Sequence, residues 1–227
     1  MEAKIYNNHS DKLILVFADW GMDETAFPNL SCTTFDLMIC FNYTTLDFHN
    51  KFSKYREINI VAWGAGVWAA SAAFDRHYRN LKLSGKLSIV RLLKKLGRCV
   101  AVNGTLCPVS NTWGVSEEQF AIMLESLKEG SGSNIPRTRA AEDMLNELAS
   151  IRENFVFCNA VLWNRIIIGK NDILIPVEKQ REFWNDFQMS LNPDNKLAFN
   201  AKDFCISTIN AGHNPFSIWK SWEEIIE

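Results

Sequence analysis

Short apolar runs, separated by longer stretches with helical spacing, dominate the first hundred positions of the chain. Four of these runs predict buried strands, at residues 13–17, 36–41, 58–62 and 99–102. Because the runs are almost continuously apolar rather than alternating, we expect a sheet covered on both faces. The stretch Val67–Tyr78, rich in alanine and aromatic residues, predicts a buried helix between the third and fourth runs. Strands that alternate with helices indicate an α/β fold with a mostly parallel sheet.

Further elements are expected at both ends of the chain. Residues 4–6 predict a short strand that pairs with 13–17 across the Asn7-Asn8 turn. In the last third, the pattern predicts a strand at 165–169, a helix at 177–189 behind Pro176, a strand at 204–207 and a terminal helix at 216–226.

Residues 108–155 have a different character from the rest. Two helical stretches, 117–129 and 139–152, flank a Gly- and Ser-rich loop at 130–136, and no strand-like run interrupts them. A helical insertion of this kind is typical of a lid over an α/β sheet. We therefore expect a core formed by 1–107 and 156–227, with 108–155 as the helical lid.

The composition of the chain excludes several function classes. Its 227 residues fit one domain, and 24 basic against 26 acidic residues give a net charge of −2, which predicts neither nucleic-acid nor membrane binding. The apolar runs are too short to span a membrane, and the polar N-terminus lacks the apolar segment of a signal peptide. We expect a cytoplasmic monomer. The cysteines are scattered and predict small buried side chains rather than a metal site or disulfides: Cys32, Cys40, Cys99, Cys107, Cys158 and Cys205.

The sharpest motif is Ala62-Trp63-Gly64-Ala65-Gly66, where a strand runs through small residues directly into a helix. This is the setting of the nucleophile elbow, whose pattern is G-x-S-x-G. Glycine enters the strained backbone of the central position easily, but the hydroxyl is missing. A tight strand-to-helix turn, or a weak phosphate-binding loop, is an equally open interpretation of the motif alone. The dinucleotide pattern G-x-G-x-x-G and the Walker A motif are absent.

Two later loops add candidate catalytic residues. Asp172 directly follows the 165–169 strand, and His213 lies in a loop between small residues after the last strand. A carboxylate in this position can accept the Nδ1 proton of a histidine and fix its tautomer. A lone Asp is more often a turn residue and a lone His more often a surface residue. Elbow, Asp and then His, however, is the chain order of the α/β-hydrolase triad.

A fourth segment, Phe17–Met22, ends the first long strand in a turn. Backbone N–H groups at such a turn and just after the elbow can stabilise a tetrahedral oxyanion. The expected donors are the amides of Trp20 and Ala65. The Trp20 side chain is equally compatible with a core or lid-packing role.

Together these segments resemble the BioG type of pimeloyl-[acyl-carrier protein] methyl ester esterase, an α/β-hydrolase of biotin synthesis. The resemblance runs nearly the full length, although the lid matches poorly. Its most specific parts are the elbow with the following Val67-Trp68 and the strand end Asn103-Gly104-Thr105. Further matches are Asp172 with Pro176, Gln180 and Trp184, and His213 with Trp219.

The resemblance implies that His213 is the general base and acid, that Asp172 orients it, and that the serine nucleophile falls at position 64, where this chain has Gly64. The implied reaction is hydrolysis of the methyl ester through a pimeloyl-enzyme, without a cofactor or metal. A chain with Gly64 cannot follow this route. We expect a nucleophile-dead serine esterase produced by a serine-to-glycine replacement; the alternative is a natural, catalytically inactive binder of an acyl group or acyl carrier protein.

The implied partner is an acyl carrier protein that carries the pimeloyl methyl ester. Carrier proteins of this kind are acidic, so a basic lid face is expected to dock them. The candidates are Lys128, Arg137, Arg139 and Arg152. Each is equally compatible with an ordinary solvated helix surface.

Overall fold

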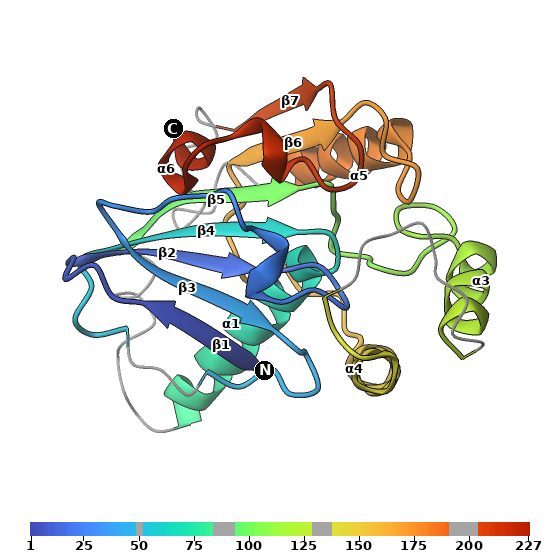
Figure 1. The fold of residues 1–227 in the computed structure, drawn as a ribbon, viewed down its shortest axis with the longest axis horizontal. Helices are drawn as coiled ribbons and strands as arrows, with labels where there is room; N and C mark the ends of the chain where they lie inside the picture. The colour runs from blue at the N-terminus through green and yellow to red at the C-terminus, as the bar shows by residue number, and fades with distance from the viewer. Residues whose placement is uncertain (49–51, 84–93, 129–137, 191–203) are drawn as a thin grey trace.

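A seven-stranded sheet forms the centre of the molecule (Figure 1). The computed structural model describes residues 1–48, 52–83, 94–128, 138–190 and 204–227. The strand order across the sheet is β1-β3-β2-β4-β5-β6-β7. The strands are β1 Glu2–Tyr6, β2 Lys12–Phe17, β3 Asp36–Phe41, β4 Glu57–Trp63, β5 Leu96–Val102, β6 Arg165–Gly169 and β7 Cys205–Ile209.

The strands β2 to β7 are parallel, and only β1 runs against its neighbour. The prediction of an α/β fold with a mostly parallel sheet is confirmed. The predicted hairpin between residues 4–6 and 13–17 is wrong, because β1 pairs with β3, with Ile5 opposite Met38. All five residues of β1 are exposed. This edge strand therefore carries no buried pattern that could have indicated its partner.

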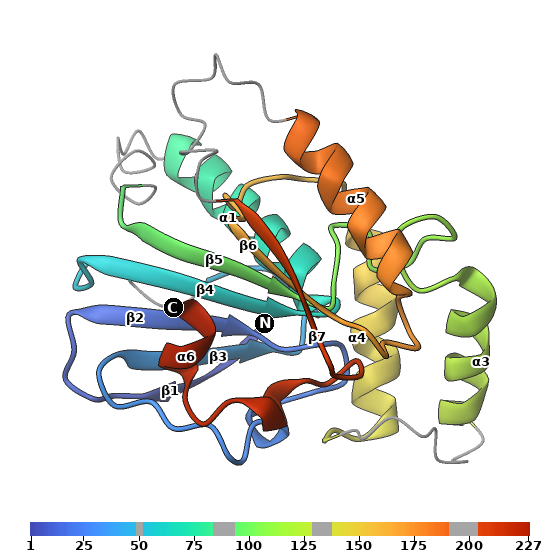
Figure 2. The ribbon, with the colours of Figure 1, turned by 90° about the horizontal axis from the view of Figure 1, so that it is seen from above.

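Helices cover both faces of the sheet (Figure 2). On one face lie α1 (Gly66–Leu83) and α5 (Val177–Ser190), and on the other lies the short α6 (Trp222–Ile226). Alternate residues of each strand enter two separate cores. In β2, Leu15 packs in the core with α1 and α5, whereas Val16 packs in the core with α6. Burial on both faces explains the continuous apolar runs of the strands.

The predicted terminal helix at 216–226 is divided in the structure. A 3-10 turn, η3 (Phe216–Ile218), is followed by Trp219 in extended backbone, and α6 begins only after Ser221. The Ser221 hydroxyl accepts from the amide of Glu224 and so caps the first turn of α6. Helix periodicity continues across the break, so the pattern alone did not reveal it. A second 3-10 turn, η1 (Glu24–Ala26), follows β2.

Two helices between β5 and β6 stand at the carboxyl ends of the parallel strands (Figure 2). They are α3 (Glu117–Lys128) and α4 (Ala141–Asn154), referred to below as the helix pair. Phe120 of α3 and Leu148 of α4 join the core on the α1 side of the sheet. The Gly- and Ser-rich loop at 130–136 lies outside the described residues. Among the helices of the described ranges, none is long and apolar enough to cross a membrane.

Candidate active site

The elbow between β4 and α1 has the backbone geometry that its sequence indicates. Gly64 has φ +57°, in the left-handed region, and α1 begins two residues later at Gly66. A Cβ at Gly66 would lie 2.4 Å from the carbonyl oxygen of Phe17, so strand β2 approaches the turn too closely for any side chain there. The small residues of the motif are therefore required by packing as well as by backbone conformation.

Asp172 lies in the turn after β6, and its side chain is fully shielded from solvent. Its Oδ1 accepts from the amides of Leu174 and Ile175 at 2.9 and 3.1 Å, and its Oδ2 accepts from the Gln180 side chain at 3.0 Å. The turn-residue interpretation and the catalytic one are thus compatible, because the same bonds that shape the turn fix the direction of the carboxylate.

His213 lies in the loop after β7 and faces this carboxylate. Its Nδ1 is 3.1 and 3.0 Å from the two carboxylate oxygens of Asp172. The loop itself is held by its backbone, because the carbonyl oxygen of His213 accepts from the Trp63 indole and the Asn103 side-chain amide, both at 2.8 Å. Asn103, part of the Asn-Gly-Thr strand end, thereby ties the histidine loop to the end of β5.

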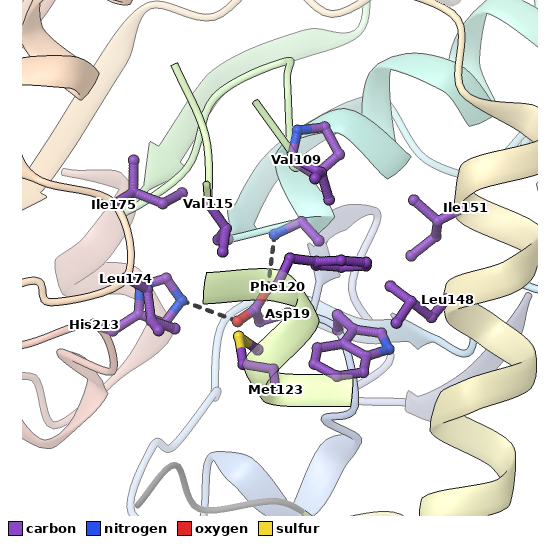
Figure 3. A pocket seen from close by; sticks show the side chains of 14 residues that line it. Asp19, Val109, Val115, Phe120, Met123, Leu148, Ile151, Leu174, Ile175 and His213 are labelled. Carbon is purple, nitrogen blue, oxygen red and sulfur yellow. Dashed lines mark hydrogen bonds and ion pairs between the residues drawn. The ribbon is translucent and has the colours of Figure 1, made fainter. Parts of the chain in front are cut away.

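Asp19 is a third ionisable residue of the site, and the sequence analysis missed its role. It follows β2, in the segment from which only Trp20 was selected. Its Oδ1 accepts from the Ala65 amide at 2.7 Å, and its Oδ2 is 2.9 Å from Nε2 of His213 (Figure 3). The sequence does carry a signal for this residue. Asp19 is an acidic side chain at the strand end where a hydrolase of this class needs uncharged hydrogen-bond donors for an oxyanion.

The imidazole of His213 therefore lies between two carboxylates. Burial by itself lowers the pKa of His213, but hydrogen bonds to Asp172 and Asp19, together with their charges, raise this pKa to about 10. The ring is accordingly protonated at neutral pH and donates a hydrogen bond on each side. This differs from the neutral imidazole that a serine hydrolase needs as its general base.

A small apolar cavity opens onto these groups. It encloses about 40 Å³, and Figure 3 shows His213 at one side, Leu148 and Ile151 of α4 at the other, and Asp19 between them. Trp20 lines the cavity, and its indole donates to the carbonyl oxygen of Met144 on α4. The lining residues are Asp19, Trp20, Gly64, Ala65, Pro108, Val109, Val115, Phe120, Met123, Leu148, Ile151, Leu174, Ile175 and His213.

The expected docking residues lie in different settings. Lys128 is exposed and pairs with Glu125 at 2.9 Å. Arg152 is exposed, lies over the ring of Phe120 and lines a groove on the outside of the helix pair. The structure contradicts the prediction for Arg139, because its side chain is only 7% exposed and is paired with the buried Glu147 at 2.6 Å. Arg137 lies outside the described residues.

Glu147 was not singled out from the sequence, where it is one of many charges in a helix. Its side chain is completely buried and accepts from three donors: the Tyr43 amide at 2.7 Å, the Gly21 amide at 3.3 Å and Arg139. Burial raises the pKa of Glu147 in spite of the nearby guanidinium of Arg139. The residue fastens α4 to the turns that follow β2 and β3.

No group of three or more His, Cys, Asp or Glu residues within the described ranges could hold a metal ion. All six cysteines are free; Cys40, Cys99 and Cys107 are buried as predicted, whereas Cys205 is exposed.

The left-handed elbow after a central parallel strand, together with an Asp and a His from later loops, defines a site of the α/β-hydrolase class. Comparison with known families specifies it further. The chain belongs to the BioG family: the family model described as pimeloyl-ACP methyl esterase BioG matches residues 1–153.

Two curated relatives match parts of the chain. A malonyl-[acyl-carrier protein] O-methyltransferase of Bacteroides fragilis is 32% identical over 77% of this chain and 36% of the relative, and an uncharacterised protein of Haemophilus influenzae is 33% identical over 58% and 54%. The chain thus spans about a third and about half of the lengths of these relatives.

Among solved structures, BioG from Haemophilus influenzae aligns over 100% of both chains with a TM-score of 0.72 and 24% identity. A thermophilic esterase from Thermogutta terrifontis aligns over 94% of this chain and 86% of the other, with a TM-score of 0.55 and 12% identity. These likenesses show the α/β-hydrolase fold.

Proposed function

We propose that this chain binds the methyl ester of pimeloyl-[acyl-carrier protein], the ester that its family is described as hydrolysing in biotin synthesis. The observation that carries the proposal is the pairing of His213 with Asp172 at the tip of a left-handed elbow, in a member of this family. The name of the Bacteroides fragilis relative refers to an acyl-carrier-protein substrate, which supports a carrier-linked ester.

A chain with Gly64 cannot use the serine-dependent mechanism. In a serine esterase, the hydroxyl at the elbow attacks the carbonyl, methanol leaves, and water then hydrolyses the acyl-enzyme. Gly64 has no atom that could make this bond. Where it has been dissected, loss of the triad nucleophile costs roughly six orders of magnitude in kcat. A catalytically inactive protein that binds an acyl group or acyl carrier protein is the second candidate, and the Asp19–His213 ion pair, which occupies the elbow, favours it.

The helix pair would serve as a lid over this site, within the insertion 108–155. The cavity of about 40 Å³ is far smaller than the roughly 300–1,000 Å³ of ordinary ligand pockets, so an acyl chain needs the helix pair to move. The groove on the outside of the pair shares four lining residues with the cavity: Pro108, Val109, Phe120 and Ile151. Displacement of these side chains would join the groove and the cavity into one channel for the acyl chain.

The test restores the serine. The structure predicts that Gly64→Ser alone gives little activity, because a Cβ at position 64 would lie 2.1 Å from Oδ1 of Asp19. The double variant Gly64→Ser with Asp19→Ala removes this obstacle and frees the Ala65 amide. We expect it to hydrolyse the methyl ester of pimeloyl-[acyl-carrier protein] and to be labelled by a serine-directed organophosphonate.

Addition of His213→Ala to the double variant is expected to abolish both the hydrolysis and the labelling. A folded double variant that binds the carrier-linked ester without hydrolysing it would support the binding-protein candidate. A folded double variant that neither binds nor hydrolyses this ester would refute the proposed function.

A further inference from the structure

The carboxylate of Asp19 occupies the space in which a serine hydrolase holds its nucleophile. A Cβ at Gly64 would lie 2.1, 2.3 and 2.8 Å from Oδ1, Cγ and Oδ2 of Asp19. Oδ1 also accepts from the amide of Ala65, the residue that follows the nucleophile position. A side chain at position 64 and the carboxylate of Asp19 would therefore occupy the same space. Only one of the two residues can place a group at the elbow tip.

The second oxygen of Asp19 points at the nitrogen that performs proton transfer in a triad. Oδ2 is 2.9 Å from Nε2 of His213, whose Nδ1 is held by Asp172 (Figure 3). The Asp19 side chain is 12% exposed and lines the cavity, so it can be reached from the cavity. The volume of about 40 Å³ is sufficient for a water molecule.

The charges of the pair suit opposite roles in acid–base chemistry. Asp19 is an acceptor in both of its contacts, as expected of a carboxylate that can take a proton from water. His213, buried beside two carboxylates, is the proton donor of the pair, and its raised pKa of about 10 keeps it charged at neutral pH. A base and an acid thus lie in contact at the site where an ester carbonyl would be bound.

We propose that Asp19 is a catalytic general base, with His213 as the general acid, for direct hydrolysis of the ester by water. This inference rests on the proposed function, from which it takes its substrate. Water gives one proton to Asp19 as its oxygen bonds to the acyl carbon. Collapse of the tetrahedral intermediate breaks the bond to the methoxy oxygen, which takes a proton from His213 and leaves as methanol. Asp19 then returns its proton to His213 across their 2.9 Å contact.

Asp19 acts as a base rather than as a nucleophile for a chemical reason. Its attack on the carbonyl would give an intermediate that carries both a carboxylate and a methoxy group. The carboxylate is by far the better leaving group, so that intermediate would collapse back to the ester. When water adds instead and is deprotonated, the intermediate carries a hydroxyl group, which leaves far less readily than a carboxylate. The route therefore requires no covalent intermediate and no side chain at position 64.

The test compares the unmodified chain with Asp19→Asn, using the methyl ester of pimeloyl-[acyl-carrier protein]. Asparagine has the same shape and can still accept from the Ala65 amide, but it is not a base. We expect kcat to fall by about 10²–10⁴-fold with little change in KM. Asp23→Asn, four residues further along the same turn, is the matched control and should keep full activity. Circular dichroism checks that both variants are folded.

A labelled-water experiment separates the base from a nucleophile. In H₂¹⁸O, over many turnovers, the free carboxylate of the product should carry ¹⁸O and the peptide that contains Asp19 should not. Incorporation of ¹⁸O into Asp19 would overturn the general-base assignment. Retention of full activity in Asp19→Asn, or lack of hydrolysis by the unmodified chain, would also overturn the general-base assignment. Asp19 would then only fill the space at the elbow tip. Hydrolysis by Gly64→Ser with Asp19→Ala would then show that the proposed substrate still stands.

Discussion

At the scale of single residues, the site depends on one imidazole between two carboxylates. Asp172 is fixed by three donors besides His213, so its orientation does not depend on the histidine. Within the described part of the chain, the carboxylate of Asp19 has two partners, the Ala65 amide and His213. The charge on His213 is therefore the main interaction that holds the Asp19 carboxylate at the elbow tip.

The charge on His213 gives a prediction about pH. The pKa of His213 is raised from the ordinary 6.5 to about 10 in the folded protein. The imidazolium therefore stabilises the fold fully below pH 6.5, by about 5 kcal/mol, and this stabilisation is lost as the pH rises through about 10. Titration of the His213 ring protons by NMR should show a charged ring at pH 8. Asp19→Asn should shift the transition to lower pH.

Asp23→Asn provides the control for this titration, because Asp23 does not contact the ring. If His213 titrates near 6.5 in the unmodified protein, the ion pair with Asp19 does not form in solution. Denaturant unfolding of His213→Gln gives an independent measurement, because its stability deficit relative to the unmodified chain should shrink between pH 7 and pH 10.5.

Chain order allowed Gly64, Asp172 and His213 to be selected from the sequence, and the structure brings all three together. The same reasoning missed Asp19. A motif search looks for the residue type that the chemistry requires at a given position. At Gly64 it therefore reports only that the serine hydroxyl is missing. Whether another side chain fills the vacated space depends on the distance between two strand ends, which no local pattern records.

At the scale of elements, the structure holds α4 in place through a buried charge. Glu147 connects the helix to the turns after β2 and β3, and Arg139 neutralises it. The turn after β2 carries Asp19, whose carboxylate accepts from the Ala65 amide at the elbow. The position of α4 is thereby coupled to the position of Asp19.

This buried pair gives a prediction about stability. Arg139→Ala leaves the carboxylate of Glu147 buried without its cation, which should lower the free energy of unfolding by about 3–5 kcal/mol. Lys128→Ala, which removes the exposed pair with Glu125, should change it by less than about 1 kcal/mol. The combination of Arg139→Met with Glu147→Gln should recover much of the loss, because the amide still accepts from Tyr43. Equal effects of Arg139→Ala and Lys128→Ala in denaturant titrations would contradict a structural role for the buried pair.

The positions of the strands could be predicted from the hydrophobic pattern wherever a strand is buried on both faces of the sheet. The run 36–41 coincides with β3, and 165–169 with β6, because both strands are almost completely buried. The edge strand β1, by contrast, was assigned the wrong partner. Its pairing depends on which strand occupies the neighbouring sheet position, and the turn at Asn7-Asn8 leads into β2 without the two strands forming a hairpin.

At the scale of the whole molecule, the structure has a nearly closed site beneath a groove whose edge carries a cation. Arg152, near the end of α4, lies over the ring of Phe120, near the start of α3, so the two helices run antiparallel (Figure 2). Lys128, at the other end of α3, is therefore remote from this edge and is already paired. Arg152 is the described residue best placed to meet an acidic carrier as its acyl arm enters the groove.

The last prediction follows from this placement. Charge reversal in Arg152→Glu should weaken binding of the pimeloyl-loaded carrier about tenfold at low salt, since the pair forms at an exposed rim where attraction is strong only without screening. At high salt the difference should shrink. Lys4→Glu makes the same change in net charge at an exposed position of the edge strand β1 that does not line the groove, and should leave the affinity unchanged. Titration calorimetry at two ionic strengths measures both, and equal weakening by the two variants would show that overall charge, rather than the groove edge, governs docking.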